Sequence, residues 1–335
     1  MKSEIKKYFS SHIIKSVKGS TCLVTGGTGM IGGEVVRLLK SMGAKVTCVS
    51  LDKLKPIKKV KYVYGDLADY NFCKKLCYKK DYLFHVAGIK GSVIVTKKKP
   101  ASFFVPLLMM NTNILEAARL NNVKKIVYTS SIGAYSPAKI FYENKDNFDK
   151  QPMDMFPGWA KRMAELQIKS YQIQYKMKNI SIVRPSNIYG PGDNFDEKNA
   201  MVIPSLISKI TKSKNGTIDV WGNGSAERDF LFSTDCAIGI IKACIIGSNM
   251  EVLNLGFGKG FKIKDIISTL QKIKNFNVKY DISKPAGFPK RIMNMNKTKK
   301  VLNFKPNFSL KEGLQITWDW FQKNNKQFLK RKNYF

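Results

Sequence analysis

The chain has 335 residues, 44% hydrophobic and 11% aromatic, which excludes a disordered protein and allows one large domain or two joined ones. No apolar run approaches the roughly 18 residues that cross a bilayer, so we expect no membrane insertion and a cytoplasmic location. The formal net charge is +34, but only seven of the 58 basic residues are arginines, and the lysines are spread along the chain. This distribution favours a lysine-rich surface that attracts small anions over one that binds nucleic acid.

Residues 2–17 are predicted to form one amphipathic helix, packed beside the main domain as an N-terminal extension over residues 1–19. After it, apolar strand-like runs alternate with helical patterns. Strands are predicted over 21–26, 45–51, 61–67, 82–88, 124–131 and 180–187, and helices over 30–43, 111–122 and 160–176. This alternation predicts an α/β fold with a doubly wound parallel sheet of the Rossmann type, whose ligands bind at the carboxyl ends of the strands.

Two regions of different character follow from this pattern. The nucleotide-binding sheet is assigned to residues 20–190, with a return segment near 233–256, and residues 191–330 are expected to form mainly a smaller substrate-binding lobe. The six scattered cysteines are expected to be buried, reduced thiols. Cys73 and Cys77 make a poor zinc site, because the sequence contains only two histidines, and no bound metal is expected.

The first predicted strand runs into a glycine-rich turn, VTGGTGMIGG, directly before a helix. Glycines at such a turn let the backbone approach a pyrophosphate closely, and the amino end of the helix offers free N–H groups to the anion. This setting predicts dinucleotide binding. The contacts are expected from Gly26, Gly29, Met30, Ile31 and Gly32.

The end of the second strand leaves the choice between NAD and NADP open. Asp52 could accept a hydrogen bond from the adenosine 2′-hydroxyl of NAD, and it would repel a 2′-phosphate. Ser50, with Lys53 and Lys55 nearby, could instead hold the 2′-phosphate of NADP.

A further adenosine contact is expected after the third strand. Asp66, in the sequence GDL, is placed to accept from the adenine amine, with Leu67 beside it. The same aspartate could instead cap the helix that follows.

The motifs TGGTGMIG, GDL, HVAG, TSSIGAY, Lys161 and RPSNIYGPGDNF follow one another in this order. They resemble the extended short-chain dehydrogenase/reductase family of nucleotide-sugar epimerases, dehydratases and reductases, nearest to the GDP-L-fucose synthase type, over nearly the whole chain. The resemblance implies hydride transfer between NAD or NADP and the sugar of a nucleoside-diphosphate sugar. It also implies a homodimer, with the helices over 111–122 and 160–176 at the interface.

In that family a tyrosine moves the hydroxyl proton, a serine or threonine hydrogen-bonds the same oxygen, and a lysine four residues after the tyrosine holds the nicotinamide ribose. By this resemblance Ser131 matches the serine and Lys161 the lysine, whereas Pro157 stands in place of the tyrosine. A cysteine and a histidine that act in fucose synthase fall at Gly133 and Gly192. The 3,5-epimerisation of that enzyme is therefore not expected here.

Three explanations of Pro157 are open. First, another group could supply the proton: Tyr135, Tyr142, or the sugar itself with water. Second, the protein could bind its ligands with little or no turnover. Third, the match could be out of register, although no Tyr-x-x-x-Lys occurs nearby. We predict an enzyme with Tyr135 among its catalytic residues. The alternative is a non-catalytic or weakly active paralogue that binds cofactor and nucleotide sugar.

The resemblance also places the contacts with the substrate. Arg228 and Arg291 match arginines that hold the diphosphate and the nucleotide, and a planar guanidinium suits two phosphate oxygens at once. Asn187 resembles a residue that contacts the diphosphate or the sugar, and Val202 resembles one that lines the nucleotide slot. Surface ion pairs for the arginines and a turn-stabilising role for the asparagine are the structural alternatives.

Overall fold

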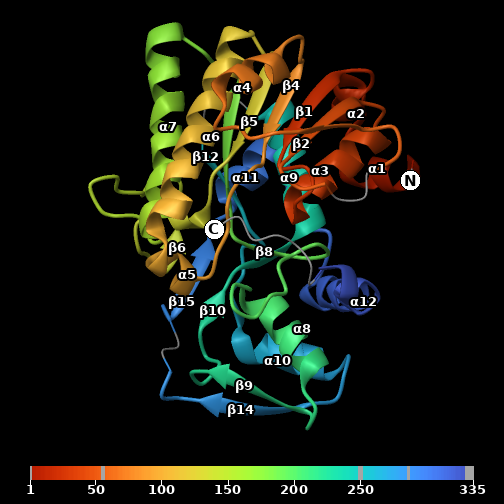
Figure 1. Cartoon of the computed structure of the whole chain (residues 1–335), viewed down its shortest axis with the longest axis vertical. Helices are drawn as coiled ribbons and strands as arrows, with labels where there is room; N and C mark the ends of the chain where they lie inside the picture. The colour runs from red at the N-terminus through yellow and green to blue at the C-terminus, as the bar shows by residue number, and fades with distance from the viewer. Residues whose placement is uncertain (1, 54–56, 248–251, 285–286, 329–335) are drawn as a thin grey trace.

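The computed structural model describes residues 2–53, 57–247, 252–284 and 287–328. A sheet of seven strands lies at its centre, and Figure 1 shows it with helices on either side. All neighbouring strands in this sheet are parallel, in the order β12-β7-β5-β4-β1-β2-β3. The strands are β1 (Thr21–Thr25), β2 (Lys45–Ser50), β3 (Lys61–Tyr64), β4 (Tyr82–His85), β5 (Lys125–Thr129), β7 (Ile180–Pro185) and β12 (Val252–Leu255). The predicted doubly wound parallel sheet is confirmed.

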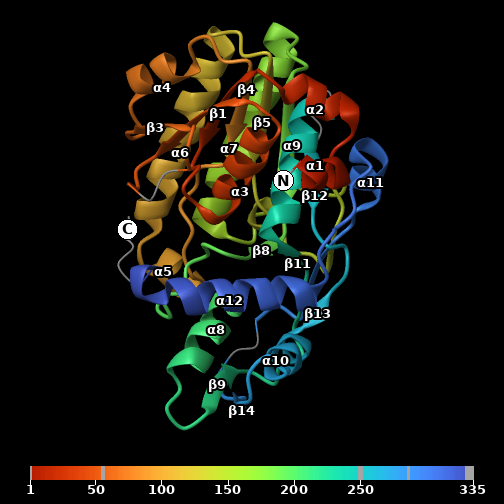
Figure 2. The ribbon, with the colours of Figure 1, turned by 90° about the vertical axis from the view of Figure 1, so that its right-hand side faces the viewer.

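Helices cover both faces of this sheet, which is why its strands are continuously apolar. One face packs against α3 (Met30–Ser41) and α9 (Ser233–Ile246), and the other against α4 (Tyr70–Cys77), α6 (Pro100–Leu120) and α7 (Met155–Tyr175) (Figure 2). Helix α9 and strand β12 come late in the sequence. They return to the sheet after the chain has passed through the smaller lobe.

The N-terminal extension differs from the predicted single helix. It forms two short helices, α1 (Lys2–Tyr8) and α2 (Ser11–Val17), and Ser10 caps the second by accepting from the Ile13 amide. Ile5, Phe9 and Ile13 are buried against the helices of the main domain. The apolar spacing continues across the break, so periodicity alone could not reveal it, whereas a serine at a helix start is a favoured cap.

The smaller lobe is built from short sheets and helices below the main sheet. Its aromatic core includes Phe321 from the sequence TWDWF, which stacks on Phe195 with ring centres 4.3 Å apart. Figure 2 shows α12 running between the main sheet and α8. The elements outside the main sheet are α5 (Val93–Lys98), the 3-10 helix η1 (Ile132–Ala134), β6 (Ile140–Phe141), β8 (Asn187–Tyr189), α8 (Val202–Lys212), β9 (Thr217–Trp221), β10 (Glu227–Arg228), β11 (Phe230–Phe232), β13 (Phe261–Lys262), α10 (Ile263–Gln271), β14 (Asn277–Asp281), β15 (Lys290–Met293), α11 (Asn296–Leu302) and α12 (Leu310–Phe328).

A buried ion network joins strands β5 and β7 to helix α7. The Arg184 guanidinium donates two hydrogen bonds to Glu165, at 2.9 and 2.5 Å, and one to Asp146 at 2.7 Å. Ser130 donates to the same Glu165 carboxylate, and Arg162 completes the network through Asp146. Because each buried charge has an opposite partner, the network fixes helix α7 relative to the end of strand β5.

The six cysteines are buried free thiols, as expected. Burial raises the pKa of Cys22 and of Cys48 to about 12, which suits structural rather than reactive thiols. Within the described part of the chain, no helix is long and apolar enough to cross a membrane, and no three histidine, cysteine or acidic side chains group as a metal site would require.

Candidate functional site

A cleft of about 1570 Å³ lies at the carboxyl ends of the sheet strands, between the sheet and the smaller lobe. Segments after β1, β2, β3, β4, β5 and β7 line one side, and residues of the lobe line the other. The strand order reverses between β1 and β4, so the connections leave in opposite directions and open a crevice there. The cleft therefore lies where a doubly wound sheet binds its ligand.

The glycine-rich turn forms the floor of the cleft below helix α3. Gly26 has φ +66°, and a Cβ there would lie 2.7 Å from the Cα of Ala87, while a Cβ at Gly32 would overlap the Gly26 carbonyl oxygen. Gly29 is the N-cap of α3. The amides of Met30 and Ile31, which begin this helix, have no carbonyl partner in a preceding turn, and both residues line the cleft. All five predicted turn residues are thus brought together at an anion-binding helix end.

Replacing Gly32 by alanine is expected to weaken NAD binding roughly tenfold or more, a loss of about 1.4 kcal/mol. The new methyl group would collide with backbone at Gly26, and backbone cannot move aside as a side chain can. Gly33→Ala is the matched control, because the atom nearest to its Cβ would be 3.7 Å away. Titration calorimetry with NAD compares the two variants, and equal affinities would show that the turn does not hold the cofactor.

The candidates for the adenosine ribose lie beside this turn. Asp52 lines the cleft, and its amide donates to the Ser50 hydroxyl at 3.1 Å. The ammonium of Lys53 lies 6.0 Å from the centre of the Tyr64 ring, and the residue is not among those lining the cleft. Lys55 lies outside the described residues. An acidic residue thus borders the cleft at the end of β2.

Asp66 and Leu67 also line the cleft, at the end of β3. The Asp66 carboxylate accepts from the Ala68 amide at 2.9 Å. Helix α4 is capped by another residue, Asp69, whose carboxylate accepts from the Phe72 amide at 3.1 Å. The alternative role for Asp66, as the cap of this helix, is therefore taken by Asp69.

Ser131 and Lys161 lie on the same side of the cleft, beyond the glycine turn. Ser131 follows β5 and its hydroxyl accepts from the Gly133 amide at 3.0 Å. The Lys161 ammonium donates to the Thr129 carbonyl at 2.8 Å and lies 5.2 Å from the centre of the Tyr128 ring. Burial lowers the pKa of Lys161 to about 8, so its charge begins to be lost just above neutral pH. The two residues matched by resemblance are thus neighbours in space.

Pro157 lies in the first turn of α7 and lines the cleft, at a position where the missing N–H breaks no helical hydrogen bond. Tyr135 does not line the cleft. It is 2% exposed, and its hydroxyl donates to the Asn254 side chain at 2.7 Å. The prediction that Tyr135 acts as a catalytic residue disagrees with this placement, because a core hydrogen bond holds the phenol away from the cleft. Tyr142 does not line the cleft either.

Sequence reasoning missed a carboxylate in this part of the cleft. Asp154 is the N-cap of α7 and lines the same cleft as Ser131. Its carboxylate lies against Gly133, so closely that a Cβ at Gly133 would overlap it. The glycine at that position is therefore required by the presence of Asp154.

On the lobe side, two arginines lie next to each other and face the cleft. Arg228 in β10 and Arg291 in β15 are register partners of two parallel strands. Among the described residues neither forms an ion pair with a carboxylate, and the Arg291 Nε is buried without a hydrogen-bond acceptor. Burial, reinforced by the charge of Arg291, lowers the pKa of Arg228 to about 10. Two adjacent cations without ion-pair partners are the kind of arrangement that suits a polyanionic group.

Asn187 and Val202 complete the predicted substrate side, and both line the cleft. The backbone and side-chain amides of Asn187 both donate to the Asp229 carbonyl, at 3.1 and 2.9 Å. The Asp229 carboxylate, also missed by sequence reasoning, accepts from the amides of Phe257 at 2.7 Å and Gly258 at 3.0 Å. Asp229, the residue after β10, therefore holds the end of the strand that carries Arg228 by hydrogen bonds with Asn187, Phe257 and Gly258. Val202 is the first residue of α8.

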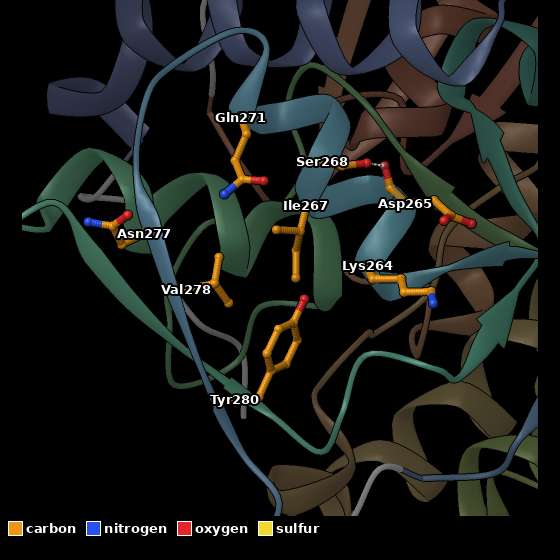
Figure 3. A pocket seen from close by; sticks show the side chains of 8 residues that line it. All are labelled: Lys264, Asp265, Ile267, Ser268, Gln271, Asn277, Val278 and Tyr280. Atoms are coloured by element: carbon orange, nitrogen blue, oxygen red, sulfur yellow. Dashed lines mark hydrogen bonds between the residues drawn. The ribbon is translucent and has the colours of Figure 1, made fainter.

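A second hollow, of about 440 Å³, lies in the lobe between α10 and β14 (Figure 3). Its charged residues, Lys264 and Asp265, are exposed, and Ser268 donates to the Asp265 carbonyl. None of the residues predicted for a site lies in it. The large cleft is therefore the candidate functional site.

Comparisons with known proteins agree with this geometry. Residues 22–256 match the NAD dependent epimerase/dehydratase family. The chain is 29% identical to a probable GDP-L-fucose synthase of Oryza sativa subsp. japonica over 320 residues, which cover 92% of this chain and 93% of that protein. An epimerase of Methanothermobacter thermautotrophicus superposes with a TM-score of 0.84 at 23% identity, covering 95% of this chain and 96% of that one. UDP-glucose 4-epimerase of Thermotoga maritima, solved with UDP-glucose, gives 0.78 at 25% identity, covering 91% and 99%.

Proposed function

Because this chain belongs to the NAD dependent epimerase/dehydratase family, we propose that it is an enzyme that modifies the sugar of a nucleoside-diphosphate sugar by hydride transfer. One observation carries the proposal. A single cleft holds the glycine turn and the Ser131–Lys161 pair on one side and the Arg228–Arg291 pair on the other. A dinucleotide on the turn and a diphosphate on the arginines would meet where the serine and lysine lie.

The residues present fit a dinucleotide, which supplies the hydride acceptor or donor when bound. The turn and the start of α3 would hold its pyrophosphate, and Lys161 would reach the nicotinamide ribose. We propose NAD over NADP, because Asp52 borders the cleft and would repel a 2′-phosphate, whereas Lys53 lies away from it. Ser131 would hydrogen-bond the reacting sugar oxygen.

The test is mass spectrometry of GDP-, UDP- and dTDP-sugars incubated with the protein and NAD or NADH. At least one sugar should change, and Ser131→Ala should lower the rate by about 10²-fold or more, because the reacting oxygen loses a positioned partner. If cofactor and nucleotide sugars bind but none is altered, even by the Pro157→Tyr variant, the protein is a binding paralogue. Nucleic acid binding with a steep salt dependence would favour a polyanion partner instead.

We also propose that the protein is a homodimer, which acts in the cytoplasm. The exposed faces of α6 and α7 carry large apolar side chains, among them Met109 at 44%, Leu166 at 46% and Ile173 at 62% exposure. Two copies that pair these helices would bury this surface. Sedimentation velocity should give twice the 38.0 kDa chain mass, and Leu166→Glu should reduce it to the monomer. A wild-type monomer would contradict the proposal.

A further inference from the structure

Pro157 leaves the Asp154 carboxylate, at the start of α7, without one of its usual hydrogen-bond donors. An aspartate at an N-cap normally accepts a hydrogen bond from the amide of the second or third helical residue. Here the third helical residue is Pro157, which has no N–H, and the Asp154 side chain makes no cap hydrogen bond. The proline thus removes a donor that would hold this carboxylate on the helix end.

The surroundings of Asp154 direct it toward the cleft. The residue is exposed overall and lines the cleft, and no described residue donates a hydrogen bond to its carboxylate, which packs against Gly133. The missing side chain at Gly133 makes room for it, beside the amide that binds the Ser131 hydroxyl. Enclosure by the protein raises the pKa of Asp154 above its usual range, and Arg291 partly offsets the rise. A carboxyl with a raised pKa therefore lies in the cleft against Gly133, whose amide donates to the Ser131 hydroxyl.

Other phenol and carboxyl groups of the cleft have hydrogen-bond or ion-pair partners, or lie elsewhere in it. Tyr189 is the one tyrosine among the described cleft residues, and its hydroxyl points to the Leu310 carbonyl, 3.5 Å away. Asp193 uses its Oδ1 for an ion pair with Lys90 at 3.4 Å and for a hydrogen bond from the Asn194 amide, whereas its Oδ2 is buried without a hydrogen-bond partner. The aspartates after β2 and β3 border the ribose end of the cleft, on the far side of the glycine turn.

We propose that the Asp154 carboxyl is the catalytic acid/base that exchanges a proton with the reacting sugar hydroxyl, in place of the side chain absent at Pro157. The inference rests on the proposed function. In the oxidative direction the sugar O–H bond would break and its proton would pass to the Asp154 carboxylate. The dinucleotide, when held by the glycine turn and Lys161, would supply the acceptor for the hydride released from the sugar C–H bond. A carbonyl forms, and reduction runs the same bonds in reverse, with neutral Asp154 donating the proton.

The decisive variant is Asp154→Asn, which keeps the size of the side chain and removes its exchangeable proton. With a nucleotide sugar that the wild-type protein converts, kcat should fall by about 10²-fold or more. Gly133→Ala should also lower kcat, because its methyl group would displace the carboxylate. Asp149→Asn, an exposed acid of the same connecting segment, is the control and should leave kcat unchanged.

A second measurement does not depend on turnover. The Asp154 carboxyl signal in the NMR spectrum of 13C-aspartate-labelled protein, assigned by its loss in Asp154→Asn, should move when UDP-glucose or GDP-mannose binds and not when UDP or GDP binds. If the wild type converts a sugar but Asp154→Asn retains kcat within about threefold, or the signal does not respond to the sugar, this inference is overturned while the proposed function stands. If the wild type converts no sugar, both fall.

Discussion

Replacing Glu165 by alanine is expected to destabilise the protein by about 3–5 kcal/mol, because it leaves the Arg184 guanidinium buried without its main opposite charge. The two side chains are 4% and 1% exposed, and Glu165 accepts two of the hydrogen bonds that Arg184 donates. Ser130 would lose its acceptor as well. A loss of this size is a large part of the 5–15 kcal/mol by which a domain is normally stable.

Urea denaturation measures the effect, with two companion variants. Glu165→Gln keeps the shape and one acceptor oxygen but not the charge, so an intermediate loss is expected, and it reports on the network even if the alanine variant does not fold. Glu197→Ala removes a surface ion pair, in which the side chains of Glu197 and Lys212 are 37% and 49% exposed. It should lower the free energy of unfolding by less than about 1 kcal/mol. Similar losses for Glu165→Ala and Glu197→Ala would contradict the role of the buried network.

The network also connects folding to the site. Ser130 is adjacent to Ser131, and Glu165 lies one helical turn after Lys161, so the same carboxylate holds the two elements that carry the proposed serine and lysine. A change at Glu165 should therefore disturb the catalytic pair without touching a ligand. This is a positioning role, because Glu165 does not line the cleft.

Six of the seven strands were predicted, because each is a short apolar run followed by a turn, whereas β12 was covered only by the return segment near 233–256. Helix boundaries were predicted less well. The helix expected over 111–122 is α6 (Pro100–Leu120), which begins eleven residues earlier and passes through Pro106. A proline inside a helical pattern normally indicates a boundary, but packing of the helix against α7 and the sheet outweighs the lost hydrogen bond here. Local preference could not reveal that tertiary contribution.

The candidate site also has parts that the sequence could predict and parts that it could not. The glycine turn and the adjacent helix start are local in sequence, so their geometry could be predicted from spacing alone. The environment of Tyr135 could not, because its hydroxyl is held by Asn254, 119 residues further along the chain. Asp154 was missed because its importance depends on two absences, the side chain at Gly133 and the N–H at Pro157, and on a fold that brings all three to one place.

Removing both Arg228 and Arg291 is expected to weaken nucleoside-diphosphate binding by roughly 10²- to 10⁴-fold. A hydrogen bond to a charged group contributes about 1.5–3 kcal/mol, so each single alanine variant should lose roughly 10- to 150-fold. The two cations face the cleft side by side, and neither forms an ion pair with a described carboxylate. Titration calorimetry with UDP and GDP gives the affinities, and Arg228→Lys should fall between wild type and Arg228→Ala because it keeps the charge but loses the planar fork.

The stability of these variants separates binding from folding. Burial and the neighbouring charge of Arg291 lower the pKa of Arg228, which means that the unliganded protein holds the charged guanidinium at a cost. Arg228→Ala should therefore leave the free energy of unfolding unchanged or slightly higher while binding is lost. Lys290→Ala, in strand β15 beside Arg291, is the control, because Lys290 pairs with Glu227 at 3.5 Å and does not line the cleft. If Arg228→Ala destabilises the protein and keeps its affinity for UDP and GDP, these arginines serve the fold, and the diphosphate must bind elsewhere.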